Sequence, residues 1–452
     1  MLEFINKYIL GATIPIALML TGLYFLFKLK FFPITKFRRV AGSLTKNGKS
    51  SLRALALSLA GTLGVGNIAG VATALCLGGM GAMFWMWVSA CVAAVLKYAE
   101  IILAMRRRVP STTGFKGGAP YYIRSLISPR LPLFGRLLSA LFALLCILNC
   151  ISMGAMIQTG AVSEALNSTL SLSPIVCGAF LALFCFILMA GGAKRITRLT
   201  SALVPFMSVF YVILSLAVII PRRSELPSLF TRIFADAVTP DSLSGGVFGF
   251  LLSRSLRFGV MRGLFSNEAG CGTSPTAHIS SDAPPCEQGF MGIIEVFVDT
   301  VLLCSMTGFA LLLADTPLSS NAPIGSVLAA YSSAFSRDLR VWIEISMALM
   351  ILCFGFATVS CLSHYALECV EFLSKNPIYR KLFIPLYSLF VLLGAVVPSE
   401  KAWAVSDTTV GFMTLINLAV LILARDEIKG ETDNYFAKVK NCPQKGKISK
   451  TP

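Results

Sequence analysis

The stretch GTLGVGNIAGVATALCLGG, residues 61–79, places glycines and one asparagine, Asn67, inside an apolar segment. Glycine destabilises a helix interior by about 1 kcal/mol relative to alanine. In lipid a helix must also satisfy its own backbone, because no water is present to do so. The stretch therefore indicates either a face that packs closely on another helix or a break in a membrane-spanning helix.

The composition places this stretch in a membrane protein. The 452 residues are 56% hydrophobic and 13% charged, whereas soluble domains carry about 25% charged residues. The apolar runs are long and continuous, which favours helices over the ten-residue alternation of a barrel. We expect an all-α polytopic membrane protein without a cleavable signal peptide.

We predict about eleven transmembrane helices from these apolar runs. They cover residues 8–29, 54–80, 82–104, 137–163, 174–191, 199–220, 244–277, 288–314, 341–367, 382–398 and 404–424. With the N-terminus outside and the C-terminus cytoplasmic, basic residues favour the inner segments by roughly four to one. The net charge of +17 is thus explained by topology, and nucleic acid is not an expected partner. We expect the basic tail to be disordered and to face anionic lipid.

Two glycine-rich spans stand five spans apart. If the first span is set aside, 54–80 opens one set of five and 244–277 opens the other, in opposite orientation. Interrupted segments at corresponding positions of inverted halves indicate a substrate site near the membrane midplane. The predicted parts are an extra N-terminal helix with a basic loop (1–50), two five-helix repeats (51–220 and 221–425) and a basic cytoplasmic tail (426–452).

A helix break offers two kinds of ligand side by side. Freed N–H groups at the start of a half-helix suit a carboxylate, and freed carbonyls at the end of the preceding half suit Na+. The competing interpretation is a small-residue packing face formed by Gly66 and Gly70. We favour a break because the glycines are dense, Asn67 adds a polar group, and a counterpart exists in the second half.

The second glycine-rich segment contains RFGVMRGLFSNEAGCGTSP, residues 257–275. Ser266 and Asn267 are substrate candidates here, and Arg262 is expected either to act directly or to pair with Glu268 or another carboxylate.

Four further charged residues lie within predicted spans, Lys97, Glu100, Glu295 and Asp299. We expect Lys97 and Glu100, one turn apart, to form an intrahelical pair or a gate contact. Glu295 and Asp299 are four residues apart, and are expected to relay protons or to pair with the arginines of the broken span. The chain has two histidines and no CxxC pair, and it shows no nucleophile–base constellation, so we expect neither a histidine-rich metal centre nor an enzyme.

Several long motifs resemble the alanine/glycine:cation symporter family (sodium:alanine symporter-like), of the amino acid–polyamine–cation superfamily. They are GTLGVGNIAGVATALCLGGMGAMFWMW with LKYAE, RFGVMRGLFSNEAGCGTSPTAH, QGFMGIIEVFVDTVLLCSMT, GGAPYYI and GGAKRITR. The resemblance covers about residues 50–425. It implies a leucine-transporter-like fold of five-plus-five inverted repeats preceded by one extra N-terminal helix, in a bacterial plasma (inner) membrane.

The resemblance also implies a function and a site. The function is Na+-coupled import of small neutral amino acids by alternating access, with lipid as surroundings and no obligate protein partner. The substrate candidates are Gly64, Gly66, Asn67, Gln158, Phe265, Ser266, Asn267, Thr358 and Leu362. The Na+ candidates are Thr62, Thr358 and Ser360. Thr358 thus has two candidate roles, which the sequence leaves open.

Three departures from the family pattern bear on specificity. Val65 stands where the family usually has threonine, and Leu362 where it usually has tryptophan. The segment Gly154-Ala155-Met156-Ile157-Gln158 keeps the family's glutamine and loses its asparagine. Loss of an indole is expected to reshape the pocket.

Two alternative functions remain. A proton-coupled symporter needs a titrating carboxylate, for which Glu268, Glu295 and Asp299 are the candidates. A non-transporting amino-acid sensor is the second alternative.

Overall fold

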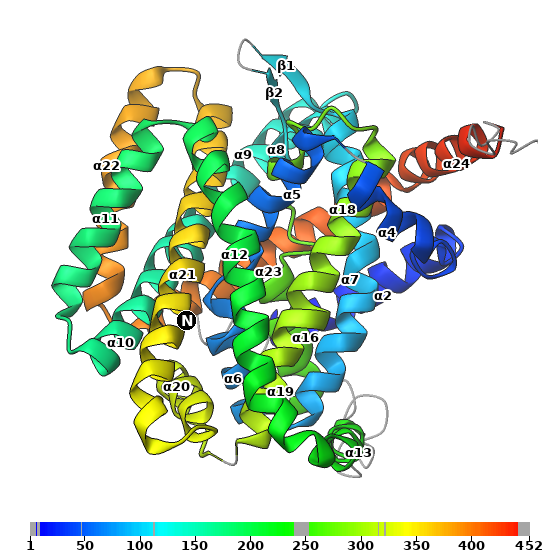
Figure 1. Ribbon diagram of the computed structural model, residues 1–452. Coiled ribbons are helices and arrows are strands. Elements are labelled where there is room, and N and C mark those ends of the chain that lie inside the picture. The colour runs from blue at the N-terminus through cyan, green and yellow to red at the C-terminus, as the bar shows by residue number, and fades with distance from the viewer. Residues whose placement is uncertain are drawn as a thin grey trace, which may run out of the picture.

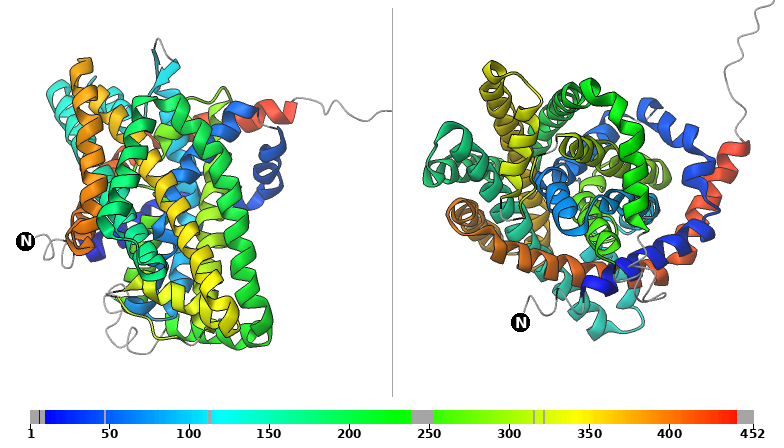
Figure 2. Two further views of the ribbon diagram at one scale, coloured as in Figure 1. Left: turned by 60° about the vertical axis from the view of Figure 1, so that its left-hand side comes forward. Right: turned by 90° about the horizontal axis from the view of Figure 1, so that it is seen from below.

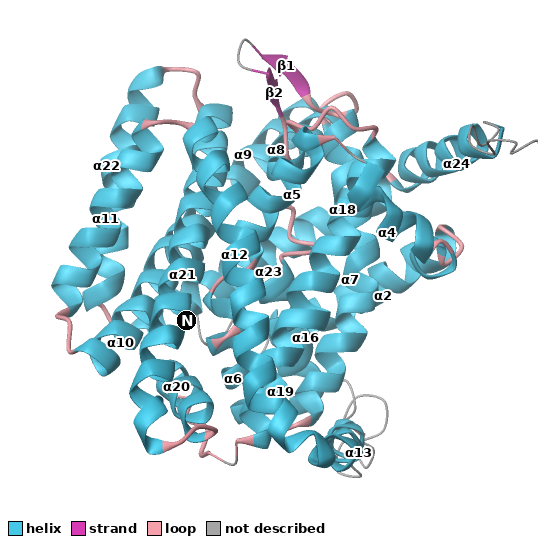
Figure 3. Cartoon of the chain, viewed as in Figure 1, coloured by secondary structure: helices cyan, strands magenta, loops and turns pink. Residues whose placement is uncertain are grey.

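The computed structural model describes residues 6, 10–46, 48–111, 114–238, 253–314, 316–320 and 322–441. In these residues the chain is a bundle of helices with one short antiparallel hairpin (Figures 1 and 3). The hairpin pairs β1 (Val109–Ser111) with β2 (Gly114–Lys116).

Within the described ranges, eight helices are long and apolar enough to span a membrane, and one bent pair provides a ninth span. The shorter apolar helix α11 (Pro174–Ala190) and the broken segment of α16 (Arg254–Asn267) with α17 (Pro275–His278) account for the other two predicted spans. The part of the predicted seventh span before Ser253 lies outside the described residues.

The predicted order of helices is confirmed, with two breaks in corresponding places. The extra helix is α2 (Gly11–Lys28), followed by short α3 (Phe32–Thr35) and α4 (Phe37–Lys46). The first half contains α5 (Lys49–Thr62), η2 (Val65–Asn67), α6 (Ala69–Gly78), α7 (Gly81–Arg106), α9 (Pro132–Asn149), η3 (Cys150–Ile157), α10 (Gln158–Leu170), α11 and α12 (Ala193–Ile219). The second half contains α16, α17, α18 (Pro285–Val296), η5 (Phe297–Cys304), α19 (Ser305–Leu313), α21 (Arg337–Leu373), α22 (Pro377–Val396) and α23 (Ser399–Leu423).

The two halves interlock through equivalent helices. α11 packs on α22, so the fourth spans of the two halves are in contact (Figure 1). α10 packs on α21, so the third spans are in contact too. α16 and α18 both pack along α7, which brings the second break against the first half. α2 lies at the periphery against α7 and α23 (Figure 2).

Short helices cover both ends of the bundle. α8 (Ala119–Ile127) and the hairpin lie at one end, called here the hairpin end. α13 (Leu226–Ala237), which follows the turn η4 (Ile220–Glu225), and α20 (Pro323–Ser333) lie at the other end, called here the α20 end (Figure 1).

The prediction of a disordered tail is wrong for residues 425–441, which form α24 (Arg425–Asn441). Glu427 of this helix forms ion pairs with Arg106 and Arg107, at the end of α7. Its Phe436 ring packs near Phe32 and Phe290. The sequence pattern misled because basic residues dominate the tail, while the few acidic and aromatic residues that dock it are spaced at helical intervals.

Candidate substrate and ion site at two helix breaks

The first break bends the chain by 60° between α5 and the η2–α6 segment. Glycine is required at its centre, because a Cβ atom on Gly64 would lie 2.6 Å from Thr358 Oγ1 and 2.9 Å from Gln158 Oε1. By contrast, no atom of another described segment lies within 4 Å of a Cβ placed on Gly70. The close approach at Gly64 is to polar side chains and Gly70 has no close neighbour, so the structure supports a break, while Gly66 alone packs closely, on Phe265.

Gln158 ties the break to the third span of the first half. The Val65 N–H, released from helical bonding, donates to Gln158 Oε1 at 2.9 Å, and Gln158 Nε2 donates to the Met153 carbonyl at 3.2 Å. The π-helical segment η3 immediately precedes Gln158. Such wide turns are frequent at functional sites because they re-aim the side chains that follow.

The second break follows α16. Glu268 adopts a left-handed conformation with φ 52°, and Gly270 and Gly272 follow with φ of 89° and 82°. The helix-end carbonyl of Asn267 accepts a hydrogen bond of 2.7 Å from Lys97 Nζ. The Gly272 N–H donates to Glu100 Oε1 at 2.9 Å. Side chains of α7 therefore hold both edges of this break.

Asp299 joins the two breaks. Its Oδ1 accepts from Asn67 Nδ2 at 2.7 Å, and its Oδ2 accepts from Ser266 Oγ at 2.7 Å and from Thr300 Oγ1 at 2.8 Å. Asn267 Nδ2 donates to Thr300 Oγ1 at 3.1 Å. These residues are all buried, and Asp299 lies in the π-helical segment η5.

This cluster brings three predicted substrate residues together, namely Asn67, Ser266 and Asn267, and adds Asp299 to them. Asn67 Oδ1 is buried and has no hydrogen-bond partner among the described residues. Every donor to the Asp299 carboxylate is a neutral amide or hydroxyl. A buried carboxylate without a cationic partner is costly in an apolar interior, so this position favours a proton or a bound cation.

Thr358 on α21 faces the carbonyl end of α5. Its hydroxyl donates to the Ala60 carbonyl at 2.9 Å and approaches the Leu63 carbonyl at 3.5 Å. These oxygens together have the chemistry of an alkali-cation site, because Na+ prefers uncharged backbone and hydroxyl oxygens at an unwound helix.

The other two Na+ candidates face their own helices. Ser360 Oγ donates to the Phe356 carbonyl at 2.7 Å, one turn earlier. Thr62 Oγ1 lies 3.4 Å from the Ser58 carbonyl and 3.5 Å from the Leu59 carbonyl. Of the three candidates, Thr358 has a hydroxyl that reaches another segment.

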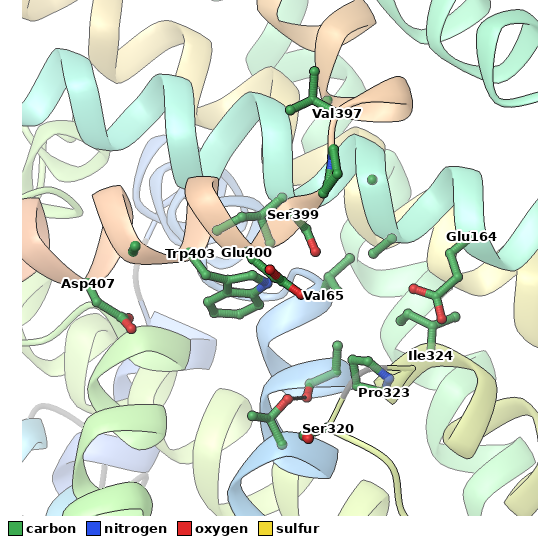
Figure 4. A pocket seen from close by; sticks show the side chains of 18 of the residues that line it. Val65, Glu164, Ser320, Pro323, Ile324, Val397, Ser399, Glu400, Trp403 and Asp407 are labelled. Carbon is green, nitrogen blue, oxygen red and sulfur yellow. Dashed lines mark hydrogen bonds between the residues drawn. The ribbon is translucent and has the colours of Figure 1, made fainter. Parts of the chain in front are cut away.

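A cavity of about 850 Å³ leads from the first break to α20 and to the loop between α22 and α23. Val65 lies at the break, and Trp403, Glu400 and Asp407 of α23 project toward the same space (Figure 4). The Trp403 ring packs against the Phe265 ring, with centroids 4.6 Å apart and planes tilted by 33°. The Phe265 ring in turn lies 3.2 Å from a Cβ built on Gly66. Phe265 is therefore sandwiched between the cavity wall and the unwound backbone.

Arg262 pairs with Asp407, at 3.6 Å, and its guanidinium carbon lies 4.5 Å from the Trp403 ring centroid. The predicted pairing with Glu268 is thus not observed, although the alternative of another carboxylate is. Trp403 and Asp407 were missed by sequence reasoning. Their spacing of one helical turn within an apolar span was the available signal.

Leu362 lies on α21 and is not among the residues that line this cavity. Leu362 is fully buried. A Cβ atom added to Gly154 would lie 2.7 Å from the Leu362 Cβ. Leu362 and Gly154 therefore pack against each other where α21 meets η3, so the departure at Leu362 lies at this helix contact.

Two of the predicted pairings between buried charges are not observed, while the alternatives of a gate contact and a proton relay stay predictions. Lys97 does not pair with Glu100; it forms an ion pair of 3.0 Å with Glu295. Glu295 and Asp299 do not pair with the arginines of the broken span. His278 Nε2 also contacts Glu295, at 3.2 Å, and amide and hydroxyl groups surround Asp299 as described. The helical pattern places Lys97 and Glu100 one turn apart, but packing of α18 along α7 offers Lys97 a closer carboxylate.

Two helices broken at corresponding positions of inverted halves, with buried polar side chains between the breaks, define a secondary transporter. The chain belongs to the sodium:alanine symporter family, whose model matches residues 1–449.

Related transporters align with nearly the whole chain. An uncharacterized transporter of Haemophilus influenzae is 34% identical over 450 residues, covering 97% of this chain and 96% of its own. The sodium/alanine symporter AgcS of Methanococcus maripaludis is 32% identical over 444 residues, covering 95% of this chain and 96% of its own. An amino-acid transporter function is thereby established in outline.

The fold is shared with solved structures. The crystal structure of MhsT in complex with L-phenylalanine superposes with a TM-score of 0.63 at 14% identity, covering 86% of this chain and 92% of that one. The predicted leucine-transporter-like class of fold is confirmed.

Proposed function

We propose that the protein imports small neutral amino acids of the alanine/glycine class together with Na+, by alternating access. The observation that carries this proposal is the pairing of ligands at one break. The Thr358 hydroxyl and the Ala60 and Leu63 carbonyls lie before it, and the Val65 N–H is turned to Gln158 just after it. An oxygen-lined cation site and an N–H group suited to a carboxylate thus share a short unwound segment.

In this proposal the substrate carboxylate takes the N–H groups around Gly64 and Gly66, and moves Gln158 from its contact with Val65. The side chain of the amino acid then points toward Phe265, whose ring approaches Gly66 closely. That close approach favours small substrates. Cation and substrate order the same backbone, so each is expected to strengthen binding of the other.

Proton coupling is the second candidate, and one observation favours it. Asp299 lies between the two breaks, and no lysine, arginine or histidine nitrogen of the described residues lies within ion-pair distance of it. A carboxylate in this position is able to carry either a proton or a second Na+. Glu295 is a weaker proton candidate because Lys97 already compensates its charge.

We further propose that the hairpin end faces the cytoplasm, with the N-terminus outside and the chain in a bacterial plasma (inner) membrane. The basic residues around the hairpin end, including Arg106, Arg107 and Arg108, support this orientation. The cavity at the α20 end would then open outward.

Uptake into proteoliposomes tests the proposal. Purified protein is reconstituted, and labelled alanine, glycine, serine, glutamine and leucine are offered with a Na+ gradient, with a proton gradient, or with neither. We expect concentrative uptake of alanine or glycine driven by Na+. Uptake driven by a proton gradient alone would select the second candidate. Binding without any uptake or counterflow would contradict transport altogether.

A further inference from the structure

A buried chain of polar contacts begins in the first turn of α5 and ends beyond the break of the same helix. Ser51 Oγ donates to Gln288 Oε1, and Gln288 Nε2 lies 2.6 Å from His278 Nδ1. His278 Nε2 lies 3.2 Å from Glu295 Oε2. Each of these four side chains is 0% exposed.

The chain continues through the second break. Glu295 forms an ion pair with Lys97. The Lys97 ammonium also donates a hydrogen bond of 2.7 Å to the Asn267 carbonyl. The Asn267 amide contacts Thr300, and Thr300 in turn donates to Asp299. Asn67, at the end of the first break, closes the chain on Asp299 at 2.7 Å.

The contacts have a fixed direction at the histidine. An amide nitrogen only donates, so Gln288 Nε2 requires an unprotonated Nδ1 on His278. The proton of the neutral ring then sits on Nε2 and points to Glu295. Ser51, Gln288 and His278 are thus ordered as successive donors toward one carboxylate, and Lys97 approaches that carboxylate as its cation.

The chain of polar contacts extends from the hairpin end of the bundle to the helix breaks. Ser51 belongs to the hairpin end of α5, whereas the cavity reaches the break from the α20 end (Figure 1). Between α5 and η2, the chain of polar contacts passes through α17, α18, α7, α16 and η5, which pack on one another. Because every member is buried, loss of one contact leaves a neighbouring polar group unsatisfied, which favours a change along the whole chain.

We propose that Lys97, His278 and Gln288 are positioning residues of transport, through which occupancy at the Asp299 end sets how tightly the first turn of α5 is held. This inference rests on the proposed function for its physiological meaning. A cation at Asp299 fixes its carboxylate, which fixes the contact of Thr300 with Asn267 and so tightens the hold of Lys97 on the second break. Coupling is reciprocal, so release of Ser51 must in turn weaken cation binding at the break.

The test combines two variants that lie away from the cation site, Ser51→Ala and Gln288→Leu. Binding of 22Na+ to purified, substrate-free protein gives the cation affinity, and hydrogen–deuterium exchange of peptides from residues 49–62 gives the hold on α5. We expect each variant to weaken 22Na+ binding about tenfold and to raise exchange in the first turns of α5. Ser51→Thr keeps the hydroxyl and is expected to retain the wild-type 22Na+ affinity and the wild-type exchange of residues 49–62.

Ser58→Ala is the matched control. Ser58 lies on the same helix, and its buried hydroxyl has no hydrogen-bond partner among the described residues. Folded Ser51→Ala protein with wild-type affinity and exchange would overturn the proposal, as would an equal effect of Ser58→Ala. Failure of wild-type uptake under both ion gradients would instead overturn the proposed function. Exchange of residues 49–62, compared with and without Na+, still decides the role of these contacts in that case, because it requires no transport.

Discussion

The backbone N–H of Val65 donates a hydrogen bond of 2.9 Å to Gln158 Oε1. A residue of the first broken span is thereby satisfied by a side chain of the third span, at the point where helical bonding stops. This contact explains how an unwound segment persists in an apolar interior, since unsatisfied backbone groups there cost several kcal/mol. It also identifies the group that a substrate carboxylate would replace.

Gln158→Glu is expected to weaken substrate binding by at least about tenfold, because a second negative charge would face the substrate carboxylate. Gln158→Ala is expected to weaken binding less, since it removes a ligand without adding repulsion. The measurement is the half-saturating alanine concentration for uptake. Ser168→Ala, whose hydroxyl bonds its own helix at the Ala165 carbonyl, serves as the control on α10. Equal affinities for Gln158→Glu and wild type would exclude a carboxylate at this position.

Gly64→Ala and Gly70→Ala separate the break from helix packing. A methyl group at Gly64 would lie 2.6 Å from Thr358 Oγ1, whereas no atom of another described segment lies within 4 Å of one at Gly70. We expect Gly64→Ala to cost about 1–3 kcal/mol through overpacking and to abolish uptake. Gly70→Ala should be neutral or stabilising, because alanine favours the helix. Thermal unfolding in detergent and uptake provide the readouts, and the reverse order would restore the packing interpretation.

Much of the fold follows from hydropathy and charge. The two breaks are recognisable because glycine-dense segments recur five spans apart, as around Gly64 and Gly270. Helix ends and the docked helix α24 are less visible, since apolar length does not tell where a surface helix finds partners. Glu427 and Phe436 reveal their role only when α7 and α18 are placed beside them.

The candidate site, like the fold, is only partly predictable from the sequence. Asn67 and Ser266 are predicted because polar groups beside helix breaks have few other roles, whereas Thr358 is predicted from the family resemblance. The partner of Lys97 was mistaken because Glu100 is nearer in sequence, while Glu295 is nearer in space. Pairings between spans depend on rotation and register of packed helices, which local spacing does not encode.

Docking of α24 is expected to depend on pH through Glu427. Burial acts to raise the pKa of Glu427, but hydrogen bonds and charge from Arg107 and Arg106 outweigh it and lower the pKa below its ordinary 4.5. A lowered pKa contributes stability that is present above the ordinary value and is lost as the pH falls through the value in the folded protein. α24 should thus stay docked at neutral pH and loosen only at a pH below the ordinary pKa of 4.5.

The mobility of a spin label at Asn434→Cys, on the exposed face of α24, measures this docking. Cys91, an exposed cysteine, is first replaced by serine. Label mobility is expected to rise at acid pH in this protein. Glu427→Gln should give high mobility already at neutral pH. A mobility that does not change with pH in either protein would show that the aromatic contacts of Phe436, and not the ion pairs, hold the helix.

Thr358→Ala and Ser360→Ala form the decisive pair for the cation site. The Thr358 hydroxyl lies 2.9 Å from the Ala60 carbonyl on another helix, whereas the Ser360 hydroxyl bonds its own helix at 2.7 Å. Removal of an oxygen ligand is expected to raise the half-saturating Na+ concentration at least about tenfold in Thr358→Ala. Thr358→Ser should preserve it, and Ser360→Ala should change it less than twofold. A larger effect at Ser360 than at Thr358 would move the cation site away from the first break, and the shared segment proposed to couple ion and substrate would lose its basis.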